Sequence, residues 1–252
     1  MSGFELFILL AGLLIGSGID AAAARYGKGV SWLTPRSRCA DCGKVLAWHE
    51  LIPLISWLVQ RGRCRACGAA IGYSAPLTEI AGALVALAAI LLTPGDAGLL
   101  LLTACFGWLL LALAAIDLRT FLLPDPLNAA VLLLGAVMVA LYQAAAWPLH
   151  VAGALAGYGI LWLMEVLYRR VRGIDGLGRG DAKLLGAIGM WVGIGGLAPV
   201  LLIASMSAIL AILAQSAIEK VSVSGKSLIA FGPWIAFGGY CVWLLRPLHF
   251  WV

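Results

Sequence analysis

Long apolar runs separated by short polar segments dominate the hydrophobic pattern of this chain. A membrane-spanning helix needs about 20 predominantly apolar residues, and runs close to that length recur along the whole sequence. We therefore predict an all-α fold, a polytopic membrane bundle of about eight transmembrane helices. The predicted spans are 4–24, 76–93, 98–116, 127–147, 151–168, 184–197, 198–218 and 229–245.

The boundary between the sixth and seventh spans is the least marked. Residues 184–218 carry no charged side chain, and the stretch is too long for one span of about 20 residues. Gly195, Gly196 and Pro199 favour a turn within it. We therefore predict that two spans meet at these residues.

Composition indicates that lipid, and not water, is the solvent for most of the chain. The sequence is 63% hydrophobic and 12% charged, whereas soluble domains carry about 25% charged residues. No basic residue precedes the first run, 4–24, so we interpret it as a retained transmembrane helix and not as a signal peptide. The net charge of +5 is explained by its distribution along the loops, and we expect no nucleic-acid partner.

The basic residues are distributed asymmetrically over the predicted loops. With eight spans, 16 of the 17 Lys and Arg residues fall on one side of the membrane and only Arg246 falls on the other. Positively charged loops remain cytoplasmic, which predicts that both termini are periplasmic. Merging the sixth and seventh spans would move Lys220 and Lys226 to the opposite side, so the charge rule favours eight spans.

Residues 25–75 form a polar insertion between the first two spans, and it contains two Cys-x-x-Cys-Gly turns. Two such turns direct four thiolates at one point and complete a tetrahedral zinc site. A cytoplasmic segment is kept reduced, which argues against the alternative of two disulfides, and iron–sulfur ligation suits this spacing less well. Because protein fills every position, the zinc would be structural. The predicted ligands are Cys39, Cys42, Cys64 and Cys67.

Two aspartates lie where predicted spans meet the cytoplasmic side. Asp117 ends the third span and Asp181 opens the sixth, so the two acids can share one membrane depth. Ionisable groups at such positions are costly and mark functional sites. Two facing carboxylates suit aspartic-protease chemistry, in which one takes a proton from water and the other hydrogen-bonds the scissile carbonyl. In the competing structural interpretation, each acid caps a helix or pairs with a basic neighbour.

These motifs together resemble the bacterial type IV prepilin peptidases, also called leader peptidase/N-methyltransferases, along nearly the whole chain. The similarity is most specific in residues 116–125 and 176–185, around the two acids. The other matching segments are Gly16-Ser17, the two cysteine pairs, and residues 52–57, 61–67, 76–79 and 231–233. On this basis we divide the chain into a first transmembrane helix (1–24), a zinc-binding insertion (25–75) and a transmembrane catalytic bundle (76–252).

The resemblance implies two reactions on a prepilin or pseudopilin substrate in the bacterial inner membrane. Asp117 and Asp181 would be the catalytic pair of a Gly-x-Gly-Asp protease that removes a short basic leader, after a glycine, at the cytoplasmic face. The new N-terminus would then be methylated, with S-adenosylmethionine as the methyl donor. The sequence has no glycine-rich nucleotide loop of the soluble methyltransferase kind to mark the donor site.

We also predict substrate contacts beside the catalytic motifs. Gly178 and Gly180 would permit a tight turn and let a substrate backbone approach the neighbouring acid. A basic leader needs acidic contacts, and Asp125 and Asp175 are the nearest candidates on the predicted cytoplasmic side. Lys183 completes the predicted substrate-binding set.

The sequence departs from the family pattern near Asp20, where the first span usually continues through Phe-Leu-Asn, and in the insertion at Ala40 and His49-Glu50. The peptidase motifs are intact. A presenilin-type protease is an alternative, but that group has tyrosine where Ile116 precedes Asp117. A non-enzyme alternative is a zinc-stabilised membrane adaptor of a secretion or pilus machine, which predicts that both acids are dispensable.

Overall fold

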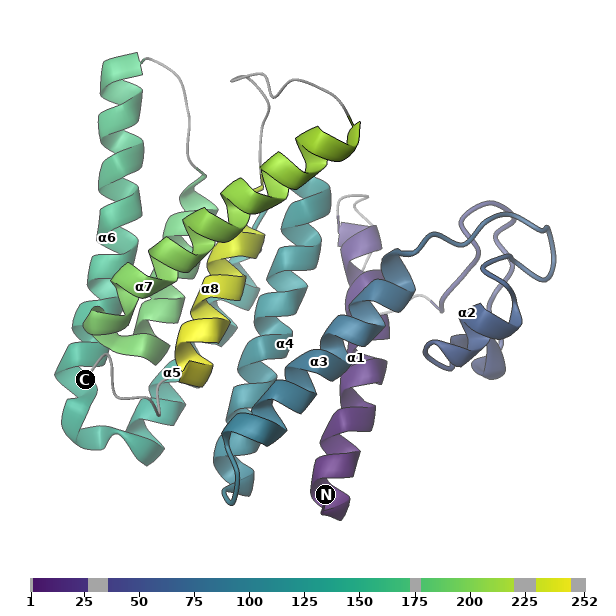
Figure 1. Ribbon diagram of the computed structural model, residues 1–252, viewed down its shortest axis with the longest axis horizontal. Coiled ribbons are helices and arrows are strands. Elements are labelled where there is room, and N and C mark those ends of the chain that lie inside the picture. Colours follow the sequence, from purple (N-terminus) through teal and green to yellow (C-terminus); the bar gives the residue numbers. More distant parts are fainter. Residues whose placement is uncertain (1, 27–35, 173–177, 220–229, 246–252) are drawn as a thin grey trace. The chain divides into compact units, whose positions relative to one another are not determined.

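The computed structural model of the chain describes residues 2–26, 36–172, 178–219 and 230–245. The chain divides into two compact units, Met1–Thr120 and Phe121–Val252. Within the described residues the secondary structure is helical, apart from two isolated β-bridges in the insertion. The elements of the first unit (Figure 1) are α1 (Gly3–Tyr26), η1 (Trp48–Leu51), α2 (Ile55–Val59), α3 (Ser74–Leu92) and α4 (Ala97–Thr120). Those of the second unit are α5 (Asp125–Tyr142), η2 (Ala144–Ala146), α6 (Trp147–Arg172), α7 (Arg179–Glu219) and α8 (Gly232–Leu245).

The predicted membrane spans correspond to helices. In the described part of the chain, six helices are long and apolar enough to cross a membrane: α1, α3, α4, α5, α6 and α7. The last predicted span is the shorter apolar helix α8. The prediction of an all-α, multi-pass membrane protein is therefore confirmed.

A break inside α7 separates the sixth and seventh predicted spans. As one straight helix its 41 residues would extend roughly 60 Å, about twice the hydrocarbon thickness. Gly193 instead has φ 70° and ψ 178°, a conformation open to glycine because it lacks a Cβ. Figure 1 shows the second half turning back along the first. The predicted turn at 195–199 is thus a few residues too late, because Pro199 is accommodated inside the second half, whereas the reversal uses a positive φ.

Close glycine contacts bring α1 against α3 in the first unit. A Cβ added at Gly12 would lie 2.5 Å from the Gly82 carbonyl oxygen, and one at Gly16 would lie 2.3 Å from that of Thr78. Such approaches are typical of membrane helices, where association depends on van der Waals packing. α4 joins them through Trp108, whose Nε1 donates to the Gly82 carbonyl at 3.0 Å.

In the second unit, α5, α6 and α8 all pack against α7. Gly153 of α6 and Gly189 of α7 meet backbone to backbone, so that a Cβ at Gly153 would lie 2.5 Å from the Gly189 carbonyl oxygen. Trp191 is fully buried. Its Nε1 donates to the Val131 carbonyl of α5 at 2.9 Å, and its ring meets Trp243 of α8 edge-on. These contacts hold three helices around the first half of α7.

Candidate active site and metal centre

Four thiols converge in the insertion between α1 and α3. The sulfur atoms of Cys39, Cys42, Cys64 and Cys67 all lie within 4.8 Å of one another. The Cys39 and Cys67 Sγ atoms are 3.9 Å apart, whereas a disulfide bond measures about 2.05 Å. A tetrahedral zinc ion with Zn–S bonds of about 2.3 Å needs sulfur–sulfur distances of roughly 3.8 Å. The cluster can therefore hold a metal ion, and the alternative of two disulfides is not supported.

Two equivalent turns position these thiols. The Gly43 N–H donates to the Cys39 carbonyl at 3.1 Å, and the Gly68 N–H donates to the Cys64 carbonyl at 2.8 Å. Both glycines have positive φ, 69° and 73°, so each turn favours glycine after its cysteine pair. Hydrogen bonds from the backbone N–H groups that follow Cys64 lower the pKa of its thiol to about 7. The thiolate, which is the metal-binding form, is thereby favoured.

A hydrogen bond to Glu79 connects the insertion to α3. Its carboxylate is buried and accepts the backbone N–H of Leu54 at 2.8 Å. Leu54 has φ 59°, a strained backbone conformation for a leucine. The contact joins residues 25 positions apart, so the sequence alone gives no sign of it.

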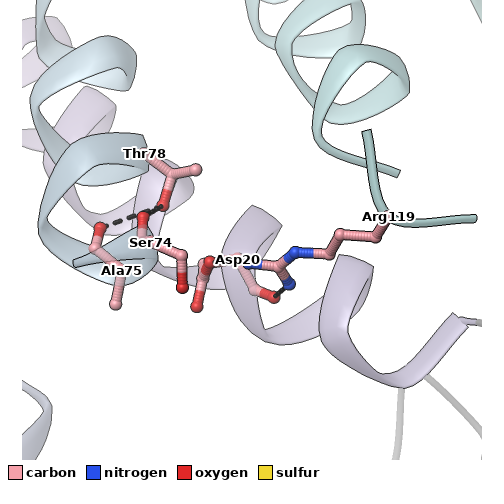
Figure 2. Close-up of polar contacts among 5 residues, drawn as sticks. All are labelled: Asp20, Ser74, Ala75, Thr78 and Arg119. Carbon is pink, nitrogen blue, oxygen red and sulfur yellow. Dashed lines mark hydrogen bonds and ion pairs between the residues drawn. The ribbon is translucent and has the colours of Figure 1, made fainter. Parts of the chain in front are cut away.

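Asp117 lies in the last turn of α4, and only 5% of its surface is exposed. The nearest cation in sequence, Arg119, forms an ion pair with the Asp20 carboxylate and donates to the Asp20 carbonyl at 2.9 Å. Figure 2 shows this pair together with the first turns of α3, where the Thr78 hydroxyl donates to the Ser74 carbonyl at 3.0 Å. The ion pair joins the end of α4 to α1 and gives Asp20 a structural partner.

Asp181 is the third residue of α7, and 9% of its surface is exposed. Its N–H donates to the Gly178 carbonyl at 3.1 Å. A Cβ added at Gly180 would lie 2.9 Å from Leu123 Cβ, whereas one at Gly178 would lie 3.6 Å from the Asp181 Oδ2 atom. The small size of Gly180 thus allows α7 to approach Leu123, which lies in the connection between α4 and α5. That of Gly178 leaves room beside the carboxylate. Substrate contact by either glycine stays a prediction.

The cations on either side of this acid in α7 pair with other carboxylates. Arg179 Nε lies 3.3 Å from Glu165 Oε1, and Lys183 Nζ lies 2.6 Å from Asp125 Oδ1. Two predicted substrate contacts, Asp125 and Lys183, therefore form one exposed ion pair with each other. Exposed pairs contribute about 0–1 kcal/mol, so another cation can displace Lys183 at little cost. Asp175, the other predicted leader contact, lies outside the described residues.

Asn128, in the first turn of α5, is a candidate residue that the sequence interpretation missed. It is buried, and neither atom of its amide group has a hydrogen-bond partner among the described residues. One turn before Asn128, Asp125 pairs with Lys183 of α7. One turn after it, the Val131 carbonyl accepts a hydrogen bond from Trp191 of α7. The available signal was a lone amide inside an otherwise apolar run.

These features define a multi-pass helical membrane protein with a buried acid near the end of one spanning helix, another near the start of a second, and a four-thiol centre outside the spans. Two family models match the chain in succession. The Bacterial Peptidase A24 N-terminal domain covers residues 10–93, and the Type IV leader peptidase family covers residues 103–213, which include Asp117 and Asp181. The chain belongs to the type IV leader peptidase family and is a peptidase.

Curated relatives align over most of the chain. These relatives are named prepilin leader peptidase/N-methyltransferase. The protein of Dickeya chrysanthemi is 37% identical to this chain, and the alignment covers 90% of this chain and 78% of the relative. The corresponding protein of Burkholderia pseudomallei is 39% identical over 87% of this chain and 69% of its own length. The protein of Klebsiella pneumoniae is 41% identical over 80% of this chain and 91% of its own length. No solved structure matches the chain significantly.

Proposed function

We propose that this chain cleaves the basic leader from type IV prepilins or pseudopilins and then N-methylates the new N-terminus. The names of its relatives combine these two activities, and the alignments cover most of both chains. The observation that carries the proposal is that the segment matching the peptidase family contains two buried acids, Asp117 and Asp181, at the ends of spanning helices.

In this proposal the two acids act as the catalytic pair. Carboxylates inside membrane helices are costly and are retained for function. Close like charges cannot both ionise easily, so the pair shares one proton. The ionised acid takes a proton from the attacking water, while the protonated acid donates a hydrogen bond to the scissile carbonyl.

Recognition of the leader would be electrostatic. A basic side chain of the leader would replace Lys183 on the exposed Asp125 carboxylate, with Asp175 as a further acidic contact. Gly178 and Gly180 would let the substrate backbone approach Asp181. Cleavage would take place at the cytoplasmic face of the bacterial inner membrane, with both termini periplasmic, as the distribution of basic residues indicates.

Two groups complete the proposal. A structural zinc ion would be held by Cys39, Cys42, Cys64 and Cys67, whose sulfur spacing suits tetrahedral coordination. With all four positions filled by protein, this ion would stabilise the insertion and take no part in cleavage. S-adenosylmethionine would supply the methyl group.

The test is cleavage of a candidate prepilin by purified enzyme, with the new N-terminus identified by mass spectrometry. Asp117→Asn and Asp181→Asn should each lower cleavage by about a hundred- to ten-thousand-fold or more, because an amide cannot act as the base. Both variants should remain folded and membrane-inserted. Asp96→Asn is the matched control, since Asp96 accepts the Leu99 N–H at 2.9 Å at the start of α4 and asparagine caps a helix equally well.

The membrane-adaptor alternative makes the opposite prediction. If either catalytic variant cleaves the prepilin at a rate close to that of the parent, the assignment of the catalytic pair is wrong. The adaptor function is favoured only if the purified parent cleaves no prepilin and both acids can be replaced without loss of function.

A further inference from the structure

The insertion exposes a row of apolar side chains that the proposed catalytic and metal sites do not use. Trp48 is 79% exposed and Leu58 is 65% exposed. The spacing of the row is that of one face of an amphipathic helix, although the segment is built from the two short helices η1 and α2. We call residues 48–59 the apolar segment; its exposed members are Trp48, Leu51, Ile52, Ile55, Leu58 and Val59.

Trp57 is the side chain of this segment that packs against the rest of the insertion. Its Nε1 donates to the Ile71 carbonyl at 3.3 Å, and its ring centroid lies 5.4 Å from that of Tyr73. Its ring also fills the space beside Gly62, where an added Cβ would lie 3.0 Å away. Trp57 thus packs inside the insertion, whereas the exposed row has little cover from the described residues.

The attachment to α3 sets the depth of the segment. Leu54 is hydrogen-bonded to Glu79, which lies five residues after the start of α3, or roughly 8 Å along the helix axis. The 19 residues of α3 span about 28 Å, close to the hydrocarbon thickness of a bilayer. A bilayer crossed by the full length of α3 would therefore place the bond between Leu54 and Glu79 close to the boundary of headgroups and acyl chains, where tryptophan is also preferred.

The charge of the insertion fits an anionic surface. Residues 36–73 contain six basic and two acidic side chains, and one of the acids, Glu50, is paired with Lys44 at 3.1 Å. Arg61, Arg63 and Arg65 directly follow the apolar segment and are exposed. Apolar side chains beside arginines are the composition of a segment that lies in a membrane interface.

We propose that the apolar segment docks on anionic lipid, with its exposed side chains at the acyl boundary and Arg61, Arg63 and Arg65 at headgroup phosphates. The docked segment would be a second attachment of the insertion to the membrane, besides the bond between Leu54 and Glu79. This interaction is separate from the proposed catalytic pair.

The test uses the full-length protein in nanodiscs of phosphatidylcholine alone or with phosphatidylglycerol. Amide hydrogen exchange of residues 48–59 should slow when the anionic lipid is present, since each basic residue near such a surface raises affinity roughly fivefold. Replacing the three arginines together by glutamine should abolish this difference, whereas replacing all three by lysine should largely keep it. Metal content is measured for each variant to confirm that the four-cysteine cluster is intact.

A second pair of variants tests the apolar contribution. Leu58→Ser should speed exchange of the segment in anionic discs. Leu77→Ser should leave it unchanged, because Leu77 is similarly exposed, at 63%, but lies on α3. The proposal is overturned if the parent exchanges equally in both lipids, or if the glutamine and lysine variants behave alike. It is also overturned if protection appears only when a prepilin is added, which would make the segment a substrate-binding surface.

Discussion

Buried polar side chains of this protein differ in whether a partner is present. Glu79 accepts a backbone N–H, and His150 lies with its Nδ1 atom 2.9 Å from the Met190 carbonyl oxygen. Asn128 is equally buried, but both polar atoms of its amide lack a partner among the described residues. Leaving such groups unsatisfied costs about 1–3 kcal/mol each, so Asn128 is expected to serve a bound ligand and not the fold.

Replacing Asn128 by leucine separates these two roles. We expect Asn128→Leu to keep or raise the thermal unfolding temperature, because it removes two unsatisfied polar atoms, and to lower prepilin cleavage. His150→Leu is the contrasting variant, and it should lower the unfolding temperature because it breaks a hydrogen bond that is made. Unchanged cleavage by Asn128→Leu, or a clear loss of stability, would remove Asn128 from the functional residues.

At the scale of elements, the four-cysteine cluster is formed by two turns of the same geometry. Each turn has a positive-φ glycine and the same backbone hydrogen bond to its first cysteine. The segment that they organise is too short to bury a core of its own, so metal binding and folding are expected to be coupled there.

Metal analysis tests the coupling. We expect one zinc ion per chain, lost when Cys67 or any of its three partners is replaced by serine, because a hydroxyl is a far poorer zinc ligand than a thiolate. The loss should appear as faster proteolysis or hydrogen exchange of residues 36–73. Cys105→Ser and Cys241→Ser, in α4 and α8, should keep the metal. A chain that carries no zinc, or a stoichiometric amount of another metal, would contradict the assignment.

On the scale of the whole molecule, the break in α7 determines the topology. If its two halves cross the membrane in opposite directions, the chain crosses eight times and the C-terminus is on the same side as the N-terminus. If α7 crossed only once, the two termini would lie on opposite sides. The placement of Lys220 and Lys226 with the other basic residues favours the first arrangement.

Reporter fusions decide between these arrangements. We expect alkaline phosphatase fused after residue 252 to be active, because that enzyme folds only in the periplasm, and a fusion within residues 25–75 to be inactive. A fluorescent-protein fusion at each position should give the opposite pattern. An inactive phosphatase at the C-terminus would reject the eight-span topology.

Much of this protein could be predicted from local sequence. The spans follow from the lengths of apolar runs, because each helix satisfies its own backbone in lipid. The cluster of four cysteines follows from their spacing, and the candidate acids follow from the rarity of charge at span ends. The position of the turn in α7 could be predicted only to within a few residues, since several residues there favour a turn and only Gly193 adopts the positive φ.

Tertiary structure alone decided which polar groups meet. Asp20 pairs with Arg119, 99 residues away, and Asp125 pairs with Lys183, 58 residues away. The anchoring of Leu54 by Glu79 and the unsatisfied burial of Asn128 likewise depend on which helix faces which. Residue type and local spacing determine whether a segment enters the membrane, whereas a contact between distant segments depends on close packing of whole helices. That packing depends on all the side chains along an interface together, and no short stretch of sequence contains it.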